Sequence, residues 1–65
     1  MIKLSKRELE VLRLLAEGLT IREIANEHNI GETTVRVQYN YLLDKLEAIN
    51  TAHVVAKAFR KGFLK

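Results

Sequence analysis

The sequence has no cysteine, no proline and no tryptophan, and 6% of its residues are aromatic. Without cysteine the chain can form neither a disulfide nor a thiolate metal site. Its apolar runs are too short to span a bilayer, and the stretch from Met1 to Ser5 lacks the apolar block of a signal peptide. These absences predict a soluble cytoplasmic protein with no metal, no cofactor and no membrane partner.

The chain has 65 residues, which predicts one small domain over residues 1–65. A domain of this size buries only about 60% of its unfolded surface, so self-association is a natural supplement to its stability. The formal net charge is +3, but residues 1–32 carry five basic and six acidic side chains, whereas residues 33–65 carry six basic and two acidic ones. The basic half favours a polyanionic partner.

Start and stop signals predict two helices in the first half of the chain. Ser5 with Glu8, and Thr20 with Glu23, have the spacing of capping boxes, and Gly18 is suited to end the first helix.

The second helix is predicted to end near His28, with Asn29 in a left-handed corner and Ile30 plugging that corner. Two helices joined by such a corner are typical of a helix-turn-helix DNA reader.

The third helix is predicted over residues 32–47. Its buried stripe is formed by apolar side chains at helical spacing, namely Val35, Tyr39, Leu42 and Leu46. The opposite side is mixed in character and carries Thr33, Arg36, Val37, Asn40, Tyr41 and Asp44.

A fourth helix is predicted from about Asn50 to about Gly62. Its apolar residues are Val54, Val55, Ala58 and Phe59. Because no segment alternates as a β-strand does, the predicted fold class is all-α, with four helices around one core.

The mixed side of the third helix is suited to DNA bases. Arg36 can bond guanine or phosphate, Asn40 can make two bonds to adenine, and Val37 can meet a thymine methyl. The alternative is an ordinary solvated face, which a valine among polar residues weakly disfavours. The candidate phosphate contacts are Thr33, Thr34, Tyr41, Lys45, Arg22 and Lys6.

Enzymatic activity is not predicted. His28 and His53 lie in different predicted helices, and the sequence has neither a Gly-rich phosphate loop nor a serine, histidine and acid constellation. We predict no catalytic residue, no metal ligand and no small-molecule site in this chain.

Several motifs resemble those of the LuxR/GerE-type helix-turn-helix domain. The matching residues are Leu4–Glu8, Glu10–Leu12, Gly18, Glu23–Ala25, Ile30, Thr34–Val35, Lys45–Leu46, Ala58 and Gly62. The resemblance covers nearly the whole chain, with Glu47 standing where the family places a glycine.

This resemblance implies a bacterial transcription regulator whose third helix enters the major groove of double-stranded DNA, usually as a homodimer. Arg36, Val37 and Asn40 then take the base-facing positions. It also implies a dimer contact within residues 53–60, formed by His53, Ala56, Lys57 and Arg60. RNA polymerase is a further candidate partner.

Two alternatives to a DNA-binding regulator remain open. A sigma-factor-like promoter-reading domain shares the Glu-Ile-Ala and Thr-Val runs, although the segment Ala52–Phe63 continues further than such a region. A protein-interaction module would bind its partner through the fourth helix. The chain fits either a free-standing regulator or the output domain of a longer protein.

Overall fold

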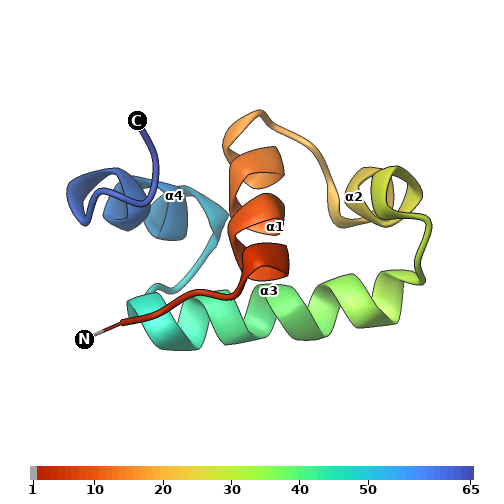
Figure 1. Ribbon diagram of the computed structural model, residues 1–65, viewed down its shortest axis with the longest axis horizontal. Helices are drawn as coiled ribbons and strands as arrows, with labels where there is room; N and C mark the ends of the chain where they lie inside the picture. The colour runs from red at the N-terminus through yellow and green to blue at the C-terminus, as the bar shows by residue number, and fades with distance from the viewer. Residues whose placement is uncertain (1) are drawn as a thin grey trace.

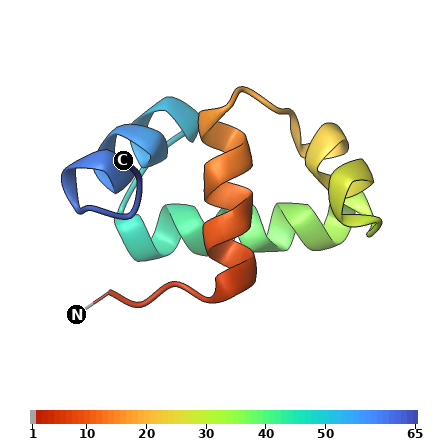
Figure 2. The same cartoon turned by 45° about the horizontal axis from the view of Figure 1, so that its top comes forward.

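The computed structural model describes residues 2–65 and has four helices, α1 (Lys6–Ala16), α2 (Ile21–His28), α3 (Glu32–Leu46) and α4 (Thr51–Arg60). The other three helices lie on one side of α3 (Figure 1). α1 crosses the middle of α3, while α2 lies over its N-terminal half and α4 over its C-terminal half (Figure 2). The predicted all-α fold with four helices is confirmed.

Both predicted capping boxes are present at the starts of α1 and α2. The Ser5 N–H donates to Glu8 Oε1 at 2.8 Å, and the Glu8 N–H donates to Ser5 Oγ at 3.1 Å. Thr20 and Glu23 make the same reciprocal pair at 2.8 and 3.2 Å. Each box satisfies backbone N–H groups that the first helical turn leaves unpaired, so it fixes where the helix begins.

Two non-glycine residues have a left-handed backbone, one in the corner before α3 and one at its end. Asn29, with φ of 56°, ends α2 and turns the chain into α3, as the sequence predicts. Glu47, with φ of 52°, ends α3, so the helix stops at Leu46, one residue earlier than predicted. Asparagine tolerates this conformation, whereas glutamate is strained by its Cβ.

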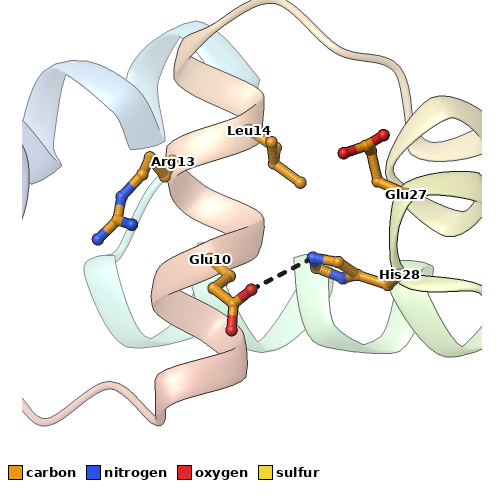
Figure 3. A pocket seen from close by; sticks show the side chains of 5 residues that line it. All are labelled: Glu10, Arg13, Leu14, Glu27 and His28. Carbon is orange, nitrogen blue, oxygen red and sulfur yellow. Dashed lines mark ion pairs between the residues drawn. The ribbon is translucent and has the colours of Figure 1, made fainter.

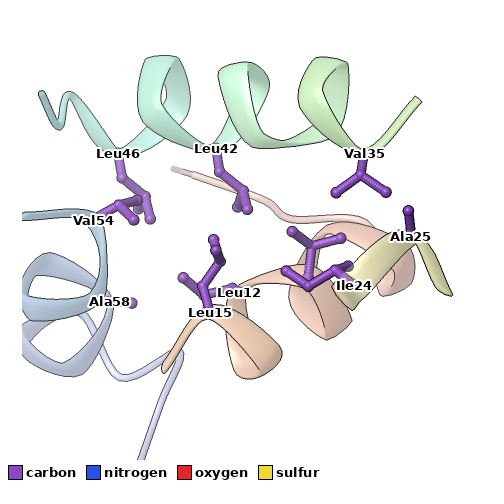
Figure 4. Packing of buried hydrophobic residues seen from close by; sticks show 10 residues of the cluster. Leu12, Leu15, Ile24, Ala25, Val35, Leu42, Leu46, Val54 and Ala58 are labelled. Atoms are coloured by element: carbon purple, nitrogen blue, oxygen red, sulfur yellow. The ribbon is translucent and has the colours of Figure 1, made fainter. Parts of the chain in front are cut away.

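The core lies between α3 and the other three helices (Figure 4). Its buried residues are Val11, Leu12, Leu15, Ile24, Ala25, Val35, Leu42, Leu46, Val54 and Ala58. Three members of the predicted α3 stripe are fully buried, and the fourth, Tyr39, is half-buried. The Tyr39 hydroxyl hydrogen-bonds Thr51 Oγ1 at 2.9 Å. That bond joins α3 to the first residue of α4.

Apolar side chains are exposed on and just before α4, which the sequence pattern does not predict. Val54 and Ala58 are fully buried, but Phe59, which the spacing groups with them, is 48% exposed. Ile49, just before α4, is 81% exposed. The apolar residues of this region therefore exceed what the core of one chain uses.

Candidate nucleic-acid interface

The side of α3 that faces away from the other helices forms the candidate interface. We call it the uncovered side, and it consists of Thr33, Arg36, Val37, Asn40, Tyr41 and Asp44, all of which are exposed. In the part of the chain that the structure describes, no other helix covers this side of α3 (Figure 1). The structure therefore brings together the three predicted base-contacting residues on one accessible surface.

Val37 is the least expected residue on that surface. It is 48% exposed in the middle of a helix, although a β-branched residue is a weaker helix former than alanine. Its exposed isopropyl group contributes nothing to the core, but it can make an apolar contact with a thymine methyl.

The first turn of α3 offers N–H groups to an anion. Gly31 caps this helix without any side-chain hydrogen bond, and Thr33 and Thr34 are exposed beside it. Unpaired N–H groups, hydroxyls and the positive end of the helix dipole suit a phosphate oxygen. Thr33 and Thr34 are thus exposed beside the N–H groups of this first turn.

Arg22 connects the start of α2 with the start of α3. Its Nε lies 3.2 Å from Glu32 Oε2, and the two side chains are 78% and 45% exposed. The sequence singles out Arg22 as a candidate phosphate contact but gives no signal of this pair, which depends on how the corner brings α2 against α3.

Lys45, another candidate phosphate contact, is engaged within the fold. Its Nζ donates to Glu8 Oε1 at 2.8 Å and to the Lys3 carbonyl oxygen at 3.3 Å. Glu8 is only 6% exposed, so the ammonium compensates a buried carboxylate. Lys45 still keeps 39% of its side chain exposed, which leaves room for a second partner.

The Glu8 carboxylate experiences opposing influences on its pKa. Burial raises the pKa, but the hydrogen bonds from Lys45 and Ser5 and the positive charge of Lys45 together hold it below the ordinary value. The pKa of Glu23 is also lowered, because its carboxylate accepts the Thr20 N–H and interacts with the Thr20 hydroxyl. Both carboxylates are therefore stabilised in their charged form.

A pocket of about 250 Å³ lies between α1 and α2 (Figure 3). It is lined by Glu10, Arg13, Leu14, Glu27 and His28. The His28 side chain is only 8% exposed, and its Nε2 lies 3.7 Å from Glu10 Oε2. His28 ends α2, as predicted, and also packs that helix against α1.

Two kinds of feature are absent from the part of the chain that the structure describes. Among residues 2–65, no three histidine, aspartate or glutamate side chains gather as metal ligands. Within the same residues, no helix has the length and apolar character needed to cross a membrane.

The predicted dimer residues of α4 differ in their exposure and in whether their side chains hydrogen-bond within the chain. His53 Nδ1 accepts the Ile49 N–H at 3.1 Å, and Lys57 Nζ donates to the Glu47 carbonyl oxygen at 2.9 Å. Both side chains thus bind the corner between α3 and α4. Ala56 is half-buried and Arg60 is exposed.

The arrangement of α2, the corner and α3 defines the class of protein domain. A short helix, a left-handed corner and a longer helix with an accessible polar side form a helix-turn-helix domain.

Comparison with known proteins gives the family. The family described as "Bacterial regulatory proteins, luxR family" matches residues 3–58. The transcriptional regulatory protein DesR of Bacillus subtilis is 40% identical over 62 residues, which cover 95% of this chain and 31% of DesR. This chain therefore belongs to the luxR family of bacterial regulatory proteins.

Solved structures of this family share the fold. The response regulator ChrA of a heme-sensing two-component system superposes with a TM-score of 0.93 and 31% identity, over 95% of this chain and 31% of that one. The Vibrio cholerae VqmA dimer, described as a LuxR-type receptor in the absence of its target DNA, gives a TM-score of 0.91 and 33% identity, over 97% of this chain and 28% of VqmA. The chain spans about a third of the length of these relatives.

Proposed function

We propose that this chain binds double-stranded DNA sequence-specifically in bacterial transcription regulation, with α3 in the major groove. The observation that carries this proposal is the uncovered side of α3, which presents Arg36, Val37 and Asn40 together while the other side is anchored in the core. A major groove admits one helix, and guanidinium, carboxamide and methyl groups match its pattern of acceptors, donors and methyls.

Phosphate contacts surround the base-facing residues in this proposal. Thr33 and Thr34 lie at the start of α3, Arg22 extends from α2, and Tyr41 is 57% exposed on the uncovered side. Lys45 reaches a phosphate with the part of its side chain that Glu8 leaves exposed. These residues fix the position of α3 on the duplex without reading its sequence.

A selection of duplexes from a random pool, followed by titration of the enriched site, tests sequence-specific binding. Arg36→Ala and Asn40→Ala each lower the affinity for that site by a factor of about 5 to 150, because each removes contacts worth about 1–3 kcal/mol. Lys61→Ala, an exposed basic residue after α4, is the control for a lost charge. The affinity falls steeply with rising salt, because bound phosphates release counterions.

If both α3 variants bound DNA as tightly as the wild type while a substitution in α4 abolished activity, a protein-interaction function through α4 would replace base reading by α3. Asp44 on the uncovered side would then be part of the contact surface for a protein partner.

We further propose that two copies associate through α4. Ala52, Ala56 and Phe59 follow one another at intervals of four and three residues, and exposed Ile49 precedes them by three. The three residues within the helix form an apolar stripe along one side of α4, and its two alanines let a second helix approach closely. Ile49 adds an exposed apolar side chain just before the helix, where the backbone is not helical. Identical stripes are complementary across a two-fold axis, so a second copy of the chain is the partner that fits.

This dimer places two copies of α3 on two half-sites about one helical turn apart, roughly 10 base pairs from centre to centre. Sedimentation measures the association directly. Ala52→Glu introduces a charge into the stripe and yields a monomer, whereas Ala16→Glu makes the same exchange at an exposed position on α1 and leaves the dimer intact. A wild type that stays monomeric on a lone asymmetric site would contradict the proposal.

A further inference from the structure

The pair formed by Arg22 and Glu32 lies at the edge of the proposed DNA interface. Glu32 is the first residue of α3, one helical turn before Arg36, so the two share a side of the helix. A carboxylate at a DNA surface repels phosphate unless a cation compensates it. Arg22 provides that cation, since its Nε lies 3.2 Å from Glu32 Oε2.

The contact between Arg22 and Glu32 occupies only some of the hydrogen-bonding atoms of the guanidinium and of the carboxylate. Arginine has five N–H donors in a planar fork, and the bond to Glu32 takes the Nε edge. Among residues 2–65 no further hydrogen bond is made by the Arg22 Nη atoms or by Glu32 Oε1. One guanidinium can therefore bind the carboxylate with Nε and a DNA phosphate with its Nη groups.

We propose that Glu32 reads a cytosine in each half-site and that Arg22 is its positioning residue, holding the carboxylate at the bases while binding a phosphate. This inference rests on the proposed DNA-binding function. In the major groove cytosine offers only the N4 donor, whereas guanine and thymine offer acceptors that repel a carboxylate, and adenine places the N7 acceptor beside its N6 donor. An acceptor-only side chain at the start of α3 therefore favours cytosine.

The alternative role for Glu32 is to stabilise the first turn of α3 through the helix dipole. Base preference separates the two roles, because a structural role alters the unfolding temperature and leaves the selected sequence unchanged. Glu32→Gln is the test variant, since it keeps the shape and removes the charge. Glu17→Gln makes the same change at an exposed position that ends α1.

Duplexes are selected from a random pool by the wild type, Glu32→Gln and Glu17→Gln. The wild type and Glu17→Gln enrich the same site, with a cytosine at one position of each half-site. Glu32→Gln loses that cytosine in favour of adenine, to which a glutamine amide can make two bonds.

In titrations, exchanging the cytosine for thymine lowers wild-type affinity by a factor of about 5 to 150 and leaves the affinity of Glu32→Gln unchanged. Arg22→Lys keeps the phosphate contact as a point charge but cannot hold both groups, so it weakens the cytosine preference.

Identical sites for the wild type and Glu32→Gln would overturn the inference while leaving the proposed function in place. Loss of the cytosine with Glu17→Gln as well would assign the effect to net charge and also overturn it. Failure of the wild type to enrich any sequence would refute the proposed function and this inference together.

Discussion

The packed and uncovered sides of α3 differ in burial and in what their side chains contact. On the packed side Val35, Leu42 and Leu46 have no exposed surface and contact the other three helices (Figure 4). On the uncovered side Arg36 and Asn40 are exposed, and within residues 2–65 neither side chain makes a hydrogen bond or ion pair. The packed side is therefore specified by the fold, whereas the uncovered side is free to match a DNA sequence.

The largest effect is expected on the packed side. Leu42→Ala leaves a cavity in the core that α3 shares with the other helices and lowers the free energy of unfolding by about 2–5 kcal/mol, which is most of the stability of so small a domain. Urea unfolding followed by circular dichroism measures the loss. Tyr41→Ala, the adjacent change on the uncovered side, shifts the same free energy by less than about 0.5 kcal/mol. Equal losses for the two variants would remove the distinction between the sides.

The second prediction concerns the polar end of the packed side, where Lys45 meets Glu8. Glu8→Gln removes the negative charge, and with it the ion pair to Lys45, at a buried site and lowers the free energy of unfolding near neutral pH by about 1–2 kcal/mol.

The pH dependence of that loss follows from the lowered pKa of Glu8. The stabilisation is complete above the unfolded-state pKa of about 4.3 and disappears as the pH falls through the lower folded-state value. Urea unfolding at a series of acid pH values should show the free energy of unfolding of the wild type approaching that of Glu8→Gln as the pH falls. Glu23 titrates in both proteins, so the difference isolates Glu8. A gap that stayed constant down to acid pH would contradict the role of its charge.

The third prediction tests the apolar part of the uncovered side. Val37→Ala lowers the affinity for the selected site by about fivefold, corresponding to about 1 kcal/mol of lost methyl contact, without lowering the stability, because alanine is the better helix former. Replacing the contacted thymine by uracil removes the other methyl. In fluorescence anisotropy titrations the two changes are expected to be non-additive. Full additivity at every thymine would show that Val37 meets no thymine methyl.

The smallest effects are expected at the two residues with left-handed backbone, Asn29 before α3 and Glu47 at its end. Glu47→Gly relieves a strained conformation and raises the free energy of unfolding by about 0.5–1 kcal/mol after the entropy of glycine in the unfolded chain is counted. Asn29→Gly brings a smaller gain, because asparagine already tolerates this conformation. Thermal unfolding of both variants ranks them, and a larger gain at position 29 would reverse the expected order.

The sequence predicts those parts of the fold that local patterns determine. The capping boxes span three residues each, Asn29 marks the corner through its own side chain, and the α3 stripe is visible in its spacing. Exposure of Arg36, Val37 and Asn40 follows from the same spacing. Their contacts with DNA remain predictions.

Contacts between distant segments were not predictable from these patterns. The bond between Lys45 and Glu8 joins residues 37 positions apart, and the contact of His28 with Glu10 depends on how α2 lies against α1. Phe59 has the spacing of a core residue but is 48% exposed. Tertiary packing decides these positions.

The most direct test of the DNA-reading role of α3 is nuclear magnetic resonance of the complex with the selected duplex. We predict intermolecular nuclear Overhauser effects from the Val37 methyls and the Asn40 carboxamide to base protons of the major groove, with the Leu42 methyls showing none. Intermolecular effects confined to α1, α2 or α4, with Val37 and Asn40 unchanged from the free protein, would contradict it.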